Sequence, residues 1–327
     1  MSDLEHKFLQ IITKGKKDNT YKFALARFLL DYSRKLDIID IKKKVKLDQK
    51  EIIKYHEISK AFLRYYWHQE CKYKIKQNHN PAKLPLVVKI IRKVFGRKYI
   101  SDSFKDMEPE KIDLAIKLIQ EHVFGSIRSK KSQVIPRFQK ISGVTALHKN
   151  TFYDYDETSI KIFPKALLFF HENYTLLFKL VILEWTRFLE KVNTVPRLVS
   201  KLESEEIKRS SLSKFVKILG TKTCFYCENS LEENKIHVDH FIPWSYIFED
   251  EPWNLVVSCD KCNLKKHDSL VDGYLNKLID RNAKFQNKIL SLKKSLIELD
   301  SGKGWKKEIR RQYRNCEEQG FSVVRLS

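Results

Sequence analysis

Apolar residues in the first 200 positions recur at spacings of three and four, which is typical of amphipathic helices. The pattern is clearest in YKFALARFLLDYSRKL at 21–36, EIIKYHEISKAFLRYYW at 51–67 and EKIDLAIKLIQEHVF at 110–124. Residues that favour helix starts precede or open two of these segments, namely Asp18, Asn19, Thr20 and Pro109. The pattern predicts a mainly helical domain over residues 1–200.

The most apolar stretch, ALLFFHENYTLLFKLVILEW at 166–185, is interrupted by His171, Glu172, Asn173 and Lys179. A membrane-spanning helix needs about 20 mostly apolar residues, so we expect a buried core helix here. The first residues also lack the basic start, apolar run and cleavage site of a secretory signal. We therefore expect a cytoplasmic protein with no membrane partner.

The helical spacing of apolar residues is interrupted after residue 194. Pro196, a charged segment and Gly220 as a helix stop indicate a domain boundary near residue 200. Residues 270–299 predict one long, basic amphipathic helix, and residues 304–319 predict a shorter one. After the boundary, KIHV at 235–238 and NLVVS at 254–258 read as strands, and NLKKHDSLVDGYL at 263–275 reads as the opening of a helix. The chain should be mainly α, with a small α+β module within residues 201–327.

The charge balance indicates a polyanionic partner. The chain has 63 Lys and Arg against 41 Asp and Glu, a formal net charge of +22. Lysines that neutralise phosphates release condensed counterions, so nucleic acid, DNA above all, is the expected partner. An anionic membrane surface is the competing partner, but the positive charge is spread along the chain rather than gathered in one amphipathic helix.

Four of the six cysteines form two CxxC pairs, Cys224/Cys227 and Cys259/Cys262. Thiolates suit the borderline softness of zinc, and two such pairs predict a structural four-cysteine Zn²⁺ site rather than disulfides. The alternative is that these are ordinary buried cysteines. The two remaining cysteines, Cys71 and Cys316, are expected to pack or stay free rather than act as nucleophiles.

The segment between and within these pairs contains a recognisable order of polar residues. It runs Asp239-His240, then Asn254 before an apolar run, then Asn263 after the second CxxC and Lys266 three residues later. Over about residues 222–270 this order closely resembles the HNH endonuclease family in its four-cysteine variant. The HNH domain of RNA-guided CRISPR effector nucleases shows the same order. The resemblance implies a ββα-metal fold and phosphodiester hydrolysis.

The chemistry of these side chains suits that reaction. Imidazole has an unperturbed pKa of about 6.5, which makes His240 the candidate general base. Asp239 and Asn263 offer hard oxygen ligands that favour Mg²⁺, with Mn²⁺ as the alternative. The resemblance implies that Asn254 holds the loop that orients His240, and that Lys266 contacts phosphate.

Local strand geometry separates the neighbouring histidines. In a regular strand Asp239 and His240 would point to opposite faces, so we expect the strand to end or bulge there, consistent with Pro243. His237 and His267 are interpreted as bystanders.

The sequence thus predicts a metal-dependent HNH endonuclease that cleaves DNA, with an N-terminal helical domain that recognises substrate or a partner. One such site cuts one strand, so a double-strand break would need a homodimer or two binding events. Restriction or antiphage defence is the setting suggested by analogy. Two alternatives stay open: a non-catalytic zinc-ribbon module that binds nucleic acid, and an effector subunit that an activating protein or RNA switches on.

Overall fold

The computed structural model describes residues 3–15, 19–78, 80, 83–96, 103–125, 134–139, 151–203, 211–232, 235–300 and 302–326. The chain divides into two compact units. The N-terminal unit comprises Met1–Cys71, Ile75–Asn193 and Leu198–Glu205. The C-terminal unit comprises Lys72–Lys74, Thr194–Arg197 and Glu206–Ser327. All the residues that resemble the HNH family lie in the C-terminal unit.

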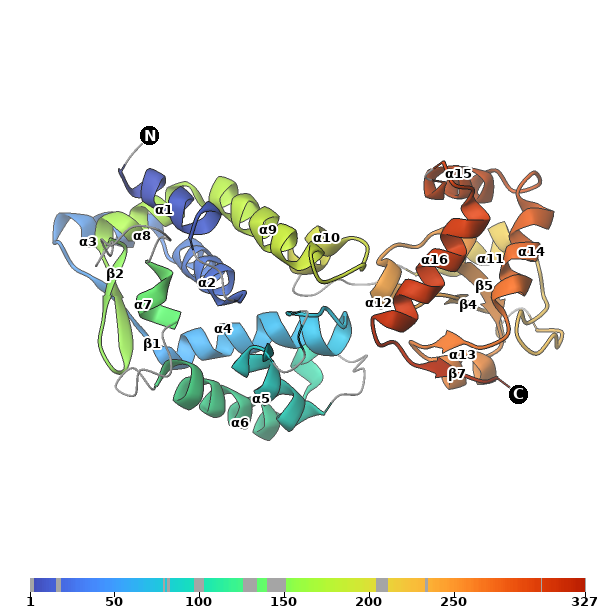
Figure 1. The fold of residues 1–327 in the computed structure, drawn as a ribbon, viewed down its shortest axis with the longest axis horizontal. Coiled ribbons are helices and arrows are strands. Elements are labelled where there is room, and N and C mark those ends of the chain that lie inside the picture. Colours follow the sequence, from blue (N-terminus) through green and yellow to red (C-terminus); the bar gives the residue numbers. More distant parts are fainter. Residues whose placement is uncertain are drawn as a thin grey trace. The chain divides into compact units, whose positions relative to one another are not determined.

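The N-terminal unit is built mainly from helices (Figure 1). They are α1 (Asp3–Thr13), α2 (Tyr21–Lys35), α3 (Ile38–Lys46), α4 (Tyr55–Trp67), α5 (Leu86–Phe95), α6 (Pro109–Ile119), α7 (Val134–Phe138), α8 (Pro164–Glu172), α9 (Tyr174–Glu190) and α10 (Leu198–Glu203). Short π-helical turns continue α4 at His68–Lys72 and α6 at Gln120–Phe124, and a 3₁₀ turn spans Phe104–Asp106.

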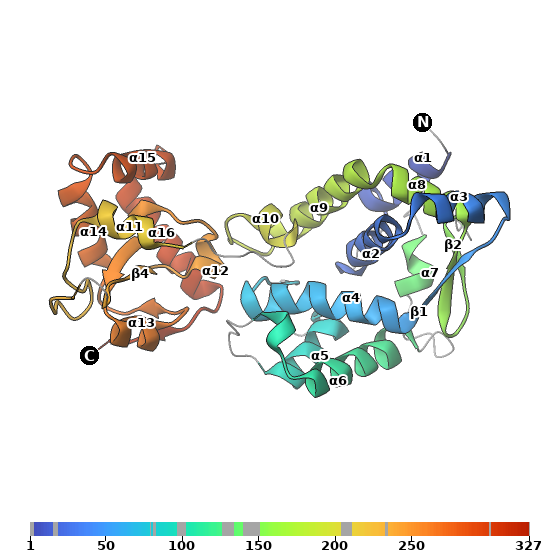
Figure 2. The same ribbon diagram turned by 180° about the vertical axis from the view of Figure 1, so that it is seen from behind.

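The core of this unit is aromatic. Helix α2 is buried along most of its length and packs against α9, where Phe23 stacks on Trp185 with ring centroids 6.2 Å apart. Helices α4, α5 and α6 lie side by side in both views (Figures 1 and 2). Phe62 of α4 meets Phe124 edge to face at 5.1 Å. Such ring pairs add to the stability that burial of apolar area supplies.

A three-stranded antiparallel sheet completes the unit, with β3 (Ser159–Ile162) between β1 (Glu51–Lys54) and β2 (Tyr153–Tyr155). The prediction of a helix over 51–67 is therefore wrong for its first four residues. In β1, Ile53 is buried and Ile52 is exposed, which is the alternation of a strand. The partner strand lies about 100 residues away in sequence, so local periodicity gave no sign of it.

The single core helix predicted over 166–185 is also wrong. Helices α8 and α9 meet at Asn173 with a bend of 82°. The Asn173 side chain donates a hydrogen bond to the carbonyl oxygen of Phe169 at 2.9 Å, which satisfies a backbone acceptor at the end of α8. Within the described residues, no single helix has the length and apolar character to cross a membrane, and only this bent pair meets both criteria together.

Helix boundaries follow the expected residues closely. Pro109 is the first residue of α6, and Gly220 ends α11 (Ser213–Leu219) in the left-handed conformation, with φ of 58°. Before α2, Oδ1 of Asn19 accepts a hydrogen bond from the N–H of Tyr21 at 3.0 Å, whereas Thr20 makes no side-chain cap. Asp18, the other expected cap, lies outside the described residues. The helix start predicted at Pro109 and the helix end predicted at Gly220 are therefore confirmed.

The C-terminal unit contains the two strands expected from the sequence (Figure 1). Its elements after α11 are β4 (His237–His240), α12 (Trp244–Ile247), β5 (Leu255–Ser258), α13 (Asp260–Lys266), β6 (Leu270–Val271), α14 (Leu275–Phe285), α15 (Leu290–Leu299), α16 (Trp305–Glu318) and β7 (Val323–Val324). Strands β4 and β5 pair antiparallel, and β6 pairs parallel with β7.

Two helix predictions fail in this unit, whereas α16 confirms the helix expected within 304–319. The helix expected over 263–275 instead begins at Asp260 and ends at Lys266, and the long helix expected over 270–299 is split into β6, α14 and α15. The first residues of that segment leave the helix because they pair with β7 near the end of the chain. The fold class is confirmed as mainly α with a small α+β module near the C-terminus.

Candidate active site

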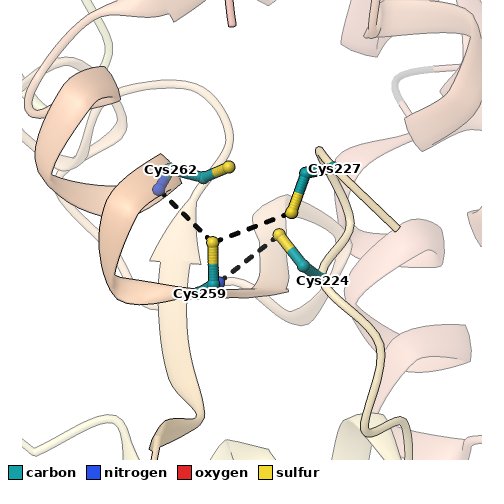
Figure 3. A group of neighbouring side chains, drawn as sticks. All are labelled: Cys224, Cys227, Cys259 and Cys262. Carbon is teal, nitrogen blue, oxygen red and sulfur yellow. Dashed lines mark hydrogen bonds between the residues drawn. The ribbon is translucent and has the colours of Figure 1, made fainter. Parts of the chain in front are cut away.

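The four paired cysteines converge on one point (Figure 3). Their sulfur atoms all lie within 4.8 Å of one another, and the sulfurs of Cys227 and Cys259 are 3.8 Å apart. A tetrahedral zinc ion with Zn–S bonds of about 2.3 Å holds its sulfurs about 3.7 Å apart. The four cysteines are therefore positioned to bind a metal, and their geometry is compatible with a structural zinc ion.

The electrostatics of the cluster also suit a cation. Burial opposes ionisation of Cys224, but backbone N–H groups, among them that of Cys259 at 3.4 Å, lower the pKa of Cys224 to about 7. Burial and the neighbouring sulfurs raise the pKa of Cys262. Cys224 thus ionises readily while Cys262 resists ionisation, and a bound cation would relieve that conflict.

The cysteine cluster joins the parts of the ββα module. The backbone N–H of Phe225, inside the first CxxC, donates to the carbonyl oxygen of Val257 on β5 at 2.8 Å. Cys259 follows β5 directly, and its sulfur accepts the N–H of Cys262 as the N-cap of α13. A two-stranded hairpin and one short helix bury little apolar area, so this junction is where a metal staple contributes most.

Asp239 on β4 is buried, and two side chains contact its carboxylate. Its Oδ2 accepts a hydrogen bond from the hydroxyl of Tyr226 at 2.6 Å, and Nζ of Lys266 lies 3.2 Å from the same carboxylate. Burial first, and then the charge of Asp239, raise the pKa of Tyr226 well above its ordinary value, so this hydroxyl stays protonated. The acid is therefore held by a donor and a cation together.

Lys266, expected at a phosphate, lies in the interior instead. Its side chain is only 1% exposed, and Nζ also donates to the carbonyl oxygen of His240 at 2.7 Å. A charge this deeply buried requires close partners of opposite polarity, and Asp239 and the His240 carbonyl supply them. In this structure the lysine connects α13 to the end of β4.

His240 is the last residue of β4, so the strand ends where expected. The β4–β5 register runs without a bulge through Asp239 opposite Val256 and His240 opposite Leu255. The two side chains accordingly leave opposite faces of the strand. Nε2 of His240 lies 3.0 Å from Oδ1 of Asp250, and both residues are largely buried.

Asn254 holds the turn that follows His240. Its side chain is fully buried, with Oδ1 accepting the N–H of Ile242 and Nδ2 donating to the carbonyl oxygen of Ile242, both at 2.8 Å. The carbonyl of Asn254 also accepts the N–H of Phe241 at 2.7 Å. This side chain therefore fixes the backbone directly after His240.

Helix α14 also forms hydrogen bonds with the residues around Asn254. Nη2 of Arg281 donates to the carbonyl oxygens of Trp253 and Leu255, the residues on either side of Asn254. Burial lowers the pKa of Arg281 to about 10, which still leaves the guanidinium charged at neutral pH. The start of β5 is thus anchored to a second helix.

Three other predicted positions lie around this core. Asn263 is partly buried in the middle of α13, between the cysteine cluster and Lys266. His237 is 44% exposed at the start of β4, with Nε2 3.8 Å from Asp260. His267 is exposed just after α13, with φ of 50°.

The residues expected to hold a catalytic metal offer a suitable donor set. Asp239 supplies carboxylate oxygens and Asn263 an amide oxygen, which are hard ligands preferred by Mg²⁺. Asp239 already attracts a cationic group, the ammonium of Lys266. An ion bound to this carboxylate would share it with Lys266 and Tyr226.

Sequence reasoning missed two residues of the site, Tyr226 and Asp250. Tyr226 is the third residue of the first CxxC, and its position next to a zinc knuckle hid its bond to Asp239. Asp250 lies ten residues after His240 in an irregular segment, where periodicity carries no information about side-chain direction. Only the folded hairpin brings these groups together.

Comparison with known proteins assigns the module. A family model described as HNH endonuclease matches residues 224–271, which include the four cysteines, Asp239, His240, Asn254, Asn263 and Lys266. Neither the curated proteins nor the solved structures contain a significant match. The resemblance inferred from the sequence is confirmed, and a nucleic acid substrate follows from it. Residues 224–271 of this chain are thus similar to the HNH endonuclease family.

Proposed function

We propose that this protein is a metal-dependent endonuclease that hydrolyses phosphodiester bonds of DNA. The observation that carries the proposal is the adjacency of Asp239 and His240 at the end of β4, where Nζ of Lys266 lies 3.2 Å from the Asp239 carboxylate and donates to the backbone carbonyl oxygen of His240. The cysteine cluster adjoins this point through α13. A module that only bound nucleic acid would not need a buried pair of lysine and acid next to a histidine whose ring is bonded to a carboxylate.

In this proposal His240 is the general base. A neutral imidazole takes a proton from the attacking water, whose oxygen then bonds to phosphorus as the bond to the leaving oxygen breaks. Asn254 keeps the backbone after His240 in place through its two hydrogen bonds to Ile242. Lys266 holds the carboxylate of Asp239 in position.

Asp239 and Asn263 would hold a Mg²⁺ or Mn²⁺ ion. Such an ion, when bound, neutralises charge on the phosphate and at the leaving oxygen. The hydrogen bond from Tyr226 keeps one oxygen of Asp239 directed toward the first zinc knuckle, which orients the carboxylate. The structural Zn²⁺ would remain with the four cysteines.

The rest of the chain supports a DNA substrate and a recognition role for the N-terminal unit. The net charge of +22 favours a polyanion, and a helical unit separate from the nuclease module can bind substrate or an activating protein or RNA. The six cysteines form no disulfide with one another, in keeping with a reducing cytoplasmic setting. Restriction or antiphage defence fits these features by analogy.

A plasmid-nicking assay with the full chain and Mg²⁺ tests the proposal. The wild type should convert supercoiled DNA to the nicked form, and His240→Ala should lose at least about 100-fold in rate, as expected for a lost general base. His237→Ala, on the same strand but exposed, is the matched control and should cleave normally. Equal rates for wild type and His240→Ala would refute the proposal that this protein is an endonuclease.

Parallel reactions with RNA and with a cell extract separate the finer alternatives. Cleavage of DNA but not RNA supports the stated substrate. Activity that appears only with extract, and is absent from His240→Ala with the same extract, identifies a partner-activated nuclease. Robust cleavage by the isolated chain removes the need for an activator.

A further inference from the structure

A hydrogen bond between His240 and Asp250 determines which ring nitrogen of the histidine is basic. Nε2 of His240 lies 3.0 Å from Oδ1 of Asp250, and the His240 side chain is only 9% exposed. An ionised carboxylate accepts hydrogen bonds and has no proton to donate. The proton in this bond is therefore on Nε2, and a neutral His240 carries its lone pair on Nδ1.

Nδ1 is left available for the reaction. Within the described part of the chain, no group forms a hydrogen bond with Nδ1, and Nδ1 is not among the fully buried polar atoms that lack a partner. The atom therefore retains access to water. The ring thus presents one nitrogen to a fixed acid and the other to the space where a water molecule can reach it.

The segment that carries Asp250 is held at both ends. On one side, the N–H of Phe248 closes α12 on the carbonyl of Trp244, and Phe248 takes the left-handed conformation, with φ of 67°. On the other side, the carboxylate of Glu251 accepts a hydrogen bond from Ser295 of α15 at 2.6 Å. Asp250 is thus placed by two neighbouring helices rather than by a free loop.

We propose that Asp250 is a positioning residue that fixes the orientation and tautomer of His240, so that Nδ1 is the atom that accepts the proton from water. The proposal rests on the proposed nuclease function. After proton transfer the imidazolium lies beside the Asp250 carboxylate, which stabilises the new charge. The same logic applies wherever a carboxylate orients a catalytic histidine through its other nitrogen.

The tautomer itself is the first measurement. In the full chain labelled with ¹⁵N-histidine, two-bond ¹H–¹⁵N correlation spectra distinguish an Nε2–H ring from an Nδ1–H ring, and the signal that His240→Gln removes is that of His240. The wild type should show His240 as the Nε2–H tautomer. Asp250→Ala should shift the ring nitrogens toward a mixture of both tautomers. A wild-type Nδ1–H tautomer would overturn the proposal.

The second measurement is the single-turnover nicking rate under saturating DNA. Asp250→Asn keeps the size of the side chain but can present an N–H to Nε2, so it should lower the rate about 10- to 100-fold. DNA affinity should stay unchanged, and Asp250→Glu should recover part of the rate. A loss of affinity with an unchanged rate, or no effect on either rate or tautomer, would refute the positioning role.

Asp260→Asn is the matched control. Asp260 also faces a histidine on the same strand, but at 3.8 Å and at the surface, so its removal should leave the rate and the His240 signal unchanged. If Asp250→Ala fails to fold, the isosteric Asp250→Asn gives both readouts. If the wild type cleaves no DNA, the nuclease proposal fails, yet the spectrum of His240 still decides whether Asp250 sets its tautomer.

Discussion

Lys266 and Asp239 form a buried ion pair in which the ammonium nitrogen lies 3.2 Å from the carboxylate. The lysine comes from α13, which begins at the second cysteine pair, and the acid comes from β4. The pair therefore couples the helix that carries Cys262 to the strand that carries His240.

Lys266→Met should destabilise the protein strongly. The substitution leaves the Asp239 carboxylate buried beside the Tyr226 hydroxyl without its cation, and removal of one partner from a buried pair costs about 3–5 kcal/mol. Urea unfolding followed by circular dichroism gives the free energy of unfolding. Lys265→Met, on the exposed side of the same helix, is the control. Equal stabilities of the two variants would contradict a structural role for this pair.

Asn254→Ala should lower both stability and nicking rate. Removal of the side chain leaves the N–H and the carbonyl of Ile242 without their partners, at a cost of about 1–3 kcal/mol for each buried group. The rate should fall because the turn after His240 loosens. Thermal melting and the plasmid assay measure the two effects, with the exposed Asn287→Ala as reference. A melting curve identical to that of the reference would contradict the role of Asn254 in holding the turn after His240.

Cys227→Ser should abolish stoichiometric zinc binding. The purified wild type is expected to contain one zinc per chain, and loss of one of four thiolates weakens a tetrahedral site severely. Metal analysis and thermal melting are the measurements, and melting should move to lower temperature. Cys71→Ser, buried but outside the cluster, should keep its zinc. Retention of full zinc by Cys227→Ser would contradict the four-cysteine site.

The exposed basic face of α16 should contribute to DNA binding. Lys307, Arg310 and Arg314 are spaced three and four residues apart, and all three are exposed. Their helix adjoins the active site, because Tyr313 packs its ring against Phe241, the residue after His240.

Replacement of these three residues by glutamine should weaken DNA binding in a His240→Ala background. The slope of log affinity against log salt should become shallower by about 0.9 for each phosphate that the variant no longer neutralises. Fluorescence anisotropy at several salt concentrations gives both quantities. A triple glutamine variant of Lys42, Lys43 and Lys46 on α3 removes the same charge from the other unit. An equal effect of the two variants would show that total charge, not this face, governs affinity.

The sequence predicted what local chemistry determines. Two CxxC pairs predicted a four-cysteine cluster that could hold a metal, because ligand spacing is a local property, and the β-prone runs around Val238 and Val256 predicted β4 and β5. Pro109 and Gly220 marked helix ends correctly because their backbone preferences act at their own positions. The fold class followed from these features.

Apart from the break between α8 and α9 at Asn173, the clearest failures involve partners distant in sequence. Residues 51–54 form a strand because they pair with 159–162, and Leu270 leaves the helix because it pairs with Val323. In the site, the burial of Lys266 and the bond between His240 and Asp250 depend on how α13 and the β4–β5 connection pack. A periodic pattern cannot identify such pairings, because it reports the face of an element and not what covers it.

Cys262 and Lys266 lie one helical turn apart on the buried side of α13. An α-helix rotates by about 100° per residue, so one residue inserted between them would turn the lysine away from Asp239 while the cysteine stayed with its cluster. The helix therefore fixes the distance and the relative direction of the cysteine cluster and Asp239. Homologous chains that vary in length should do so outside 259–266, and a variant with an alanine inserted after Asn263 should keep its zinc but lose the ion pair.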